Sequence, residues 1–145
     1  MKVLVTGAAG GLGRAYVNEC VRRGWNVCGV DVNAAGLAGI REGVRFRTGR
    51  AILVFPCDLT DDGDVGRLME FLHENAFEPD MLLNVAGLDY EGGFLDRRFQ
   101  ELRRIVDVNI LGTMRVTHRI VSARTAETPF YMIFVSSLAA GQPRP

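Results

Sequence analysis

The sequence contains almost no lysine and no excess of charge of either sign. Lys2 is the single lysine among 17 basic residues, and 17 acidic residues balance them, so the formal net charge at pH 7 is zero. Proteins that bind nucleic acids or anionic membrane surfaces generally carry clustered positive charge. Because the acidic and basic residues are interleaved along this chain, we expect neither a nucleic-acid partner nor a membrane partner.

Long apolar runs and paired cysteines are also missing. No stretch approaches the roughly 18 apolar residues that cross a bilayer, and the apolar start at residues 1–5 is too short for a signal peptide. Cys20, Cys28 and Cys57 are far apart in the sequence and lack the spacing of a metal site. These absences predict a cytoplasmic protein with reduced, buried thiols and no metal ion.

The composition is that of a globular protein, with 48% hydrophobic and 23% charged residues in a chain of 145. Short apolar segments alternate with longer segments of helical periodicity. The expected strands cover 2–6, 25–30, 51–55, 81–85 and 130–135, and the clearest expected helices cover 12–23, 61–77 and 97–123. This alternation predicts a single α/β domain over residues 1–145, built on a doubly wound parallel sheet of about five strands flanked by helices.

Residues 34–50 are harder to interpret. A short helix fits residues 34–40, whereas residues 43–49 read as a loop with nearby arginines. We interpret Arg45, Arg47 and Arg50 as solvated loop residues, with a phosphate site as the alternative.

The glycine-rich segment 6–13 (TGAAGGLG) lies between an expected strand and an expected helix. Glycine allows a tight turn and a close approach of a pyrophosphate to the backbone, and the amides at a helix N-terminus bind phosphate oxygens. In this context the predicted cofactor contacts of the turn are Gly7, Gly10, Gly11, Leu12 and Gly13.

Asp31 ends the second expected strand, 18 residues after Gly13. An acidic residue at this place accepts hydrogen bonds from the ribose hydroxyls of an adenosine, and its charge repels a 2′-phosphate. Asp31 therefore predicts NAD rather than NADP as the cofactor. The alternative interpretation of Asp31 is a turn-forming residue after a strand.

Five motifs occur in a fixed order at the ends of expected strands or within an expected helix. They are 6–13 (TGAAGGLG), 57–61 (CDLTD), 84–87 (NVAG), 107–113 (DVNILGT) and 135–141 (VSSLAAG). Each is weakly specific alone, but together they resemble the short form of the short-chain dehydrogenase/reductase family. The resemblance implies a Rossmann-type fold. For whole family members it implies hydride transfer between a nicotinamide cofactor and an alcohol or carbonyl substrate.

The resemblance also implies roles for individual residues. Asp58 and Leu59 are cast as neighbours of the adenine. Three residues at or just beyond the end of the fourth expected strand are cast as cofactor-site residues: Asn84, Ala86 and Gly87. Val85 departs from the family pattern, which has a second asparagine there.

Asn109 and Ser137 are the catalytic residues that the resemblance implies. Asn109 interrupts an otherwise apolar helix face, where an unpaired amide is costly to bury. The family's Tyr-x-x-x-Lys acid–base pair is absent, because none of Tyr16, Tyr90 and Tyr131 has a lysine four residues later. We therefore expect this chain, which lacks the C-terminal strands and helices of the full family fold, to be inactive alone.

Three alternatives stay open. The spacing of Gly7, Gly10 and Gly13 also fits the extended branch of the family, which includes sugar-nucleotide epimerases. The chain could instead be a non-catalytic dinucleotide-binding module, or an assembly module. An uncovered fifth strand and an uncovered face of the 97–123 helix would favour association, so we expect a homo-oligomer.

Overall fold

The apolar segments expected as strands pair into one parallel sheet in the computed structural model, which describes residues 1–137. The strands are β1 (Lys2–Thr6), β2 (Asn26–Asp31), β3 (Leu53–Pro56), β4 (Met81–Asn84) and β5 (Tyr131–Phe134), in the order β3-β2-β1-β4-β5. The helices are α1 (Gly11–Arg22), α2 (Ala34–Thr48), α3 (Asp62–Glu74), α4 (Phe99–Val106) and α5 (Thr113–Ala123). This confirms the predicted doubly wound sheet.

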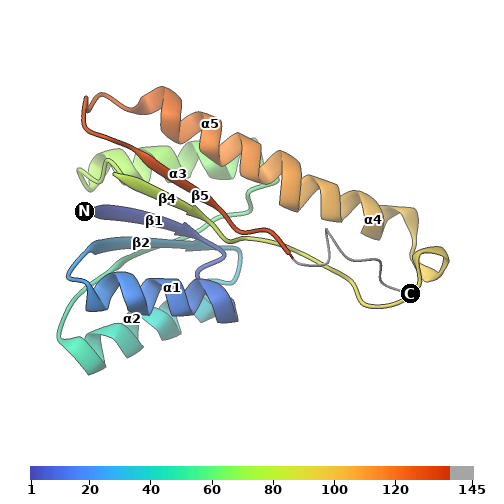
Figure 1. The fold of residues 1–145 in the computed structure, drawn as a ribbon, viewed down its shortest axis with the longest axis horizontal. Coiled ribbons are helices and arrows are strands. Elements are labelled where there is room, and N and C mark those ends of the chain that lie inside the picture. The colour runs from blue at the N-terminus through green and yellow to red at the C-terminus, as the bar shows by residue number, and fades with distance from the viewer. Residues whose placement is uncertain (138–145) are drawn as a thin grey trace.

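Helices cover both faces of the sheet (Figure 1). Successive strand residues point to opposite faces, so Val3 and Val5 pack with α1 and α2. Leu4 points the other way and packs with residues of α3 and α5, such as Leu68 and Ile120. Because all strands run in parallel, their carboxyl ends meet at one edge of the sheet, and the loops that follow them gather there.

The expected loop over residues 43–49 is wrong, because α2 continues to Thr48. Its buried face carries Leu37, Ile40 and Val44, and this packing outweighs the low helix propensity of the glycines within it. Arg45 and Arg47 therefore lie on a helix.

Arg50 lies in the loop between α2 and β3, but its guanidinium is bound to the protein. Its guanidinium donates hydrogen bonds to the carbonyl oxygens of Val21 (2.9 Å), Gly24 (3.0 Å) and Trp25 (3.1 Å). Arg50 therefore stabilises the connection between α1 and β2. This role differs from both interpretations of the sequence, a solvated side chain and a phosphate ligand.

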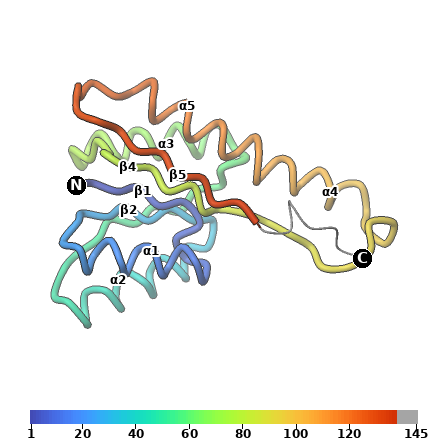
Figure 2. The backbone as a smooth tube through the Cα atoms, in the orientation of Figure 1, coloured from blue at the N-terminus to red at the C-terminus, as the bar shows by residue number. Residues whose placement is uncertain are grey.

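The expected 97–123 helix forms one continuous coil (Figure 2), but its hydrogen bonding is not uniformly α-helical. A short 3-10 turn, η1 (Phe94–Asp96), precedes α4, and a π-helical segment, η2 (Asp107–Gly112), separates α4 from α5. Figure 1 shows α4 reaching past the carboxyl ends of the strands. Within residues 1–137 no helix is long and apolar enough to span a membrane.

Candidate functional site

The glycine turn between β1 and α1 is packed backbone against backbone. Gly7 has a φ of +67°, and a Cβ atom built on it would lie 2.7 Å from the Cα of Ala86. A Cβ atom on Gly13 would lie 1.9 Å from the carbonyl oxygen of Gly7. These two positions therefore exclude any side chain whether or not a ligand is bound.

Gly11 differs from these two, because no heavy atom lies within 4 Å of a Cβ atom built on it. Gly10 is the N-cap of α1, and the amides of the first helical turn that follows have no acceptor within the helix. Leu12 is exposed beside them. Open space next to free amide groups is what a pyrophosphate requires, so these residues fit a dinucleotide.

Asp31 lies against the glycine turn. Its Oδ2 atom accepts a hydrogen bond from the Ala9 amide (3.0 Å), and its Oδ1 atom accepts one from the Asn33 amide (2.9 Å). Each carboxylate oxygen can accept a further bond. The carboxylate is thus held at the carboxyl end of β2, directly beside the turn.

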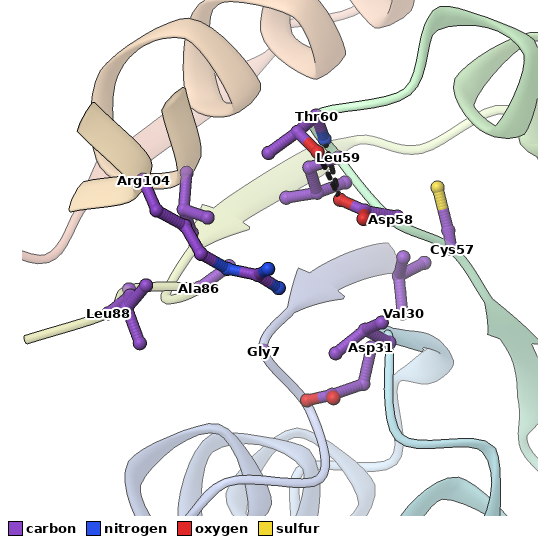
Figure 3. A pocket seen from close by; sticks show the side chains of 13 residues that line it. Gly7, Val30, Asp31, Cys57, Asp58, Leu59, Thr60, Ala86, Leu88 and Arg104 are labelled. Carbon is purple, nitrogen blue, oxygen red and sulfur yellow. Dashed lines mark hydrogen bonds between the residues drawn. The ribbon is translucent and has the colours of Figure 1, made fainter. Parts of the chain in front are cut away.

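A cavity of about 180 Å³ opens at this edge of the sheet (Figure 3). Its lining includes six of the residues that the sequence predicted: Gly7, Asp31, Asp58, Leu59, Ala86 and Gly87. Residues at or just beyond the carboxyl ends of β1, β2, β3 and β4 thus meet there. Ligands of open α/β sheets bind at such a place, outside the carboxyl ends of the strands. The cavity is smaller than a typical site for a whole drug-sized ligand and suits one end of a dinucleotide.

Asp58 is held by its own loop. Its Oδ1 atom accepts hydrogen bonds from the Thr60 amide (2.9 Å) and the Thr60 hydroxyl (2.7 Å). These bonds, with smaller contributions from Arg104 and Arg115, lower the pKa of the Asp58 carboxyl. Asp58 is therefore ionised at neutral pH.

The family model described as short chain dehydrogenase matches residues 1–145. The chain belongs to the short-chain dehydrogenase family. Serine 3-dehydrogenase of Rhizobium radiobacter is 30% identical over 142 residues, which cover 97% of this chain and 55% of that protein. Zerumbone synthase of Zingiber zerumbet is 29% identical over 143 residues, which cover 95% and 53%. This short-chain dehydrogenase chain thus spans about half the length of the relatives it matches.

Solved structures agree with this membership. A short chain dehydrogenase from Mycobacterium smegmatis has a TM-score of 0.90 at 25% identity, covering 99% of this chain and 60% of that one. The bulky-bulky ketone specific alcohol dehydrogenase from Comamonas testosteroni has a TM-score of 0.85 at 25% identity, covering 98% and 57%. A short-chain dehydrogenase from Sphingobium yanoikuyae in complex with NADPH has a TM-score of 0.73 at 27% identity, covering 83% and 47%. The chain is an NAD(P)-binding Rossmann-type domain of this family.

Asn84 ends β4 and is buried beneath α5. Its amide nitrogen donates to the Thr117 hydroxyl (3.3 Å), and its Oδ1 atom has no hydrogen-bond partner among residues 1–137. Asn84 does not line the cavity. The other predicted site residues that do not line it are Gly10, Gly11, Leu12, Gly13, Asn109 and Ser137.

Thr6, which the sequence analysis did not single out, fixes the end of β4. Its Oγ1 atom accepts hydrogen bonds from the amides of Val85 (3.1 Å) and Ala86 (3.2 Å). The signal in the sequence was a buried strand ending on a hydroxyl residue directly before a glycine turn.

Asn109 lies in the π-helical segment η2 and holds the loop after β4. Its Oδ1 atom accepts from the Leu88 amide (2.7 Å), and its Nδ2 atom donates to the Leu88 carbonyl (2.8 Å). Leu88 lines the cavity, as do Val108 and Arg104, which the sequence analysis also missed. Asn109 therefore positions one wall of the site in this dehydrogenase fold.

Ser137 lies three residues beyond the end of β5, at the same edge of the sheet, and is exposed. The single lysine of the sequence and one of its three tyrosines lie at the other end of the strands. Lys2 and Tyr131 begin β1 and β5, at the opposite edge of the sheet, and the Nζ atom of Lys2 donates to the Ala76 carbonyl (2.7 Å).

Proposed function

We propose that residues 1–145 form the NAD-binding part of a short-chain oxidoreductase whose whole form interconverts an alcohol and a carbonyl compound. The turn of Gly10–Gly13 would hold the pyrophosphate, and the cavity beside Asp31, Asp58 and Leu59 would hold the adenosine. When bound, a nicotinamide ring accepts or donates a hydride. Ala86 and Gly87 would border the cofactor from the β4 side, with Asn84 supporting them from below.

The position of Asp31 carries the preference for NAD. Its carboxylate is fixed by two amide hydrogen bonds at the rim of the adenosine cavity. A 2′-phosphate placed there would meet like charge. The NADPH bound in the neighbour from Sphingobium yanoikuyae makes NADP the competing cofactor that an experiment has to separate.

Titration calorimetry with NAD⁺ and NADP⁺ tests this preference. We expect wild type to bind NAD⁺ more tightly, and Asp31→Asn to reduce the ratio of the two affinities by roughly tenfold or more, since it removes one charge but keeps an acceptor for the Ala9 amide. Equal affinities in the wild-type protein, or a ratio that Asp31→Asn does not change, would contradict the assignment. Binding of neither cofactor at millimolar concentration would remove the proposed function altogether.

We further propose that this stretch of chain does not catalyse turnover by itself. Asn109 and Ser137 remain the predicted catalytic residues, with Asn109 acting by positioning, but a general acid–base pair is worth about 10²–10⁴-fold in rate. The sequence supplies no tyrosine followed by lysine at the family spacing. NAD⁺ reduction by residues 1–145 in the presence of a panel of alcohols would overturn this proposal.

A second candidate function, assembly, is favoured by the exposed apolar side chains along β5 and the α4–α5 run. All four residues of β5 are exposed, and so are Phe99, Ile110 and Met114. Exposed apolar side chains of this kind favour association, so we propose a homo-oligomer formed through this region. The three free, buried cysteines support our proposal of a cytoplasmic location.

A further inference from the structure

Among the described residues that line the adenosine cavity, Arg104 is the one cation. Figure 3 shows its side chain reaching from α4 into the cavity, with the guanidinium directed toward the space between Asp58 and Asp31. Within residues 1–137, no hydrogen bond or ion pair holds this guanidinium. Its hydrogen-bond donors are therefore available to a bound ligand.

Other arginines of the same helical run are committed to partners. The Nε atom of Arg103 lies 3.5 Å from Asp107, and the guanidinium of Arg115 donates to the Leu59 carbonyl (2.6 Å). Arg119 pairs with Asp62 at 2.9 Å. Arg104 thus differs from its neighbours in facing the cavity with its donors free.

A positive charge in this cavity favours the binding of a dinucleotide. Two carboxylates, Asp31 and Asp58, face a space of about 180 Å³, and a dinucleotide carries negative charge of its own. A guanidinium between them offsets repulsion that would otherwise oppose binding. It also lies near enough to Asp58 to help hold the pKa of that carboxyl down.

The shape of the group matters as well as its charge. The remaining walls include apolar side chains such as Val30, Leu59 and Val108, which suit the face of a flat base. A guanidinium is planar and weakly hydrated, and it stacks on aromatic rings, whereas an ammonium is a compact, strongly hydrated point charge.

We propose that Arg104 binds the adenine base of the cofactor by stacking its guanidinium on the ring, closing the cavity from the α4 side. This inference rests on the proposed function and names one residue of the site. A role in recognising a 2′-phosphate is the competing assignment, and it would affect NADP⁺ alone.

The test measures binding by calorimetry for the full chain with 5′-AMP, NAD⁺, NADP⁺ and nicotinamide mononucleotide. Arg104→Met keeps the length of the side chain but removes its charge and plane, and Arg104→Lys keeps the charge alone. Arg103→Met is the matched control on the next residue of α4. Thermal unfolding checks that each variant is folded.

We expect Arg104→Met to weaken binding of 5′-AMP, NAD⁺ and NADP⁺ by a similar factor of roughly ten, and Arg104→Lys to restore only part of it. Binding of nicotinamide mononucleotide by Arg104→Met, and all binding by Arg103→Met, should equal wild type. Unchanged 5′-AMP affinity in Arg104→Met, full rescue by lysine, or a loss confined to NADP⁺ would each overturn the stacking role while leaving the proposed function intact. A wild-type protein that binds none of the ligands would instead overturn the proposed function and, with it, this inference.

Discussion

Apolar side chains are buried in the core beside α1 but exposed along the edge strand β5. Val3, Val5 and Val17 are fully buried between the sheet and its helices, whereas Ile133 and Phe134 of β5 are 41% and 56% exposed. The inner strands are paired on both sides and covered by helices, while β5 pairs only with β4 within the described residues. The cofactor side of the sheet is thus packed and preformed, and the β5 side is an open apolar surface next to it.

Among the variants that test this difference, we expect the largest loss of stability at the glycine turn. Gly13→Ala places a methyl group 1.9 Å from the Gly7 carbonyl oxygen, so the backbone must shift. We expect it to lower the free energy of unfolding by more than about 4 kcal/mol, measured by urea denaturation with the fluorescence of Trp25.

Gly11→Ala is the matched variant in the same turn, because its methyl group enters open space. We expect a change in stability within about 1 kcal/mol but a clear loss of NAD⁺ affinity. If both alanine variants are equally unstable, the distinction between a packing glycine and a ligand-approach glycine is wrong.

A smaller difference is expected between two strand residues. Leu4 is fully buried in β1 and Ile133 is partly exposed in β5. Leu4→Ala should cost about 2–5 kcal/mol of unfolding free energy, since it leaves a cavity in the core. Ile133→Ala should cost under about 1 kcal/mol. Similar costs in urea denaturation at low protein concentration would indicate that β5 is covered in solution.

Association should respond to charge on the open surface. Met114→Lys in α5 is expected to shift the protein toward monomer in sedimentation experiments, because it places a charge on exposed apolar surface. Phe46→Lys is the control, since Phe46 is 93% exposed on α2 across the sheet. A wild-type protein that is monomeric at high concentration would refute the assembly proposal.

The smallest expected effect concerns Asp58. Its folded-state pKa is lowered by Thr60, so its contribution to stability is present above the unfolded pKa of about 4 and is lost as the pH falls through the lower folded value. Thr60→Val removes the hydroxyl bond but keeps the amide bond. We expect a loss of roughly 1 kcal/mol or less at pH 7 and a higher Asp58 pKa by NMR titration. An unchanged pKa would contradict the role given to the hydroxyl.

The sequence predicted what depends on local patterns. The order of strands and helices follows from their apolar periodicity, and the glycine turn with Asp31 follows from its spacing. The C-terminal half of α2 was not predicted, because its glycines lower the helix propensity of the segment. Burial of Leu37, Ile40 and Val44 stabilises the helix in the folded chain.

Contacts between distant residues could not be predicted in the same way. Asn109 was singled out, but its partner Leu88 is 21 residues away in a loop without a distinctive pattern. Arg104 belongs to a helix rich in arginine, and only the folded arrangement distinguishes the one that faces the cavity. Arg103 and Arg104 are adjacent in the sequence, yet Arg103 pairs with Asp107 and Arg104 lines the cavity.

The hydrogen bond from the Ala9 amide to Asp31 ties the choice of cofactor to the shape of the phosphate turn. A residue that removes the side-chain oxygen together with the acidic charge would leave that amide without its acceptor. Any natural or engineered route toward NADP in this lineage is therefore constrained to side chains that still accept a hydrogen bond at this point, or to compensating changes in the turn. With any other side chain at this position, the cofactor preference and the shape of the turn would have to change together.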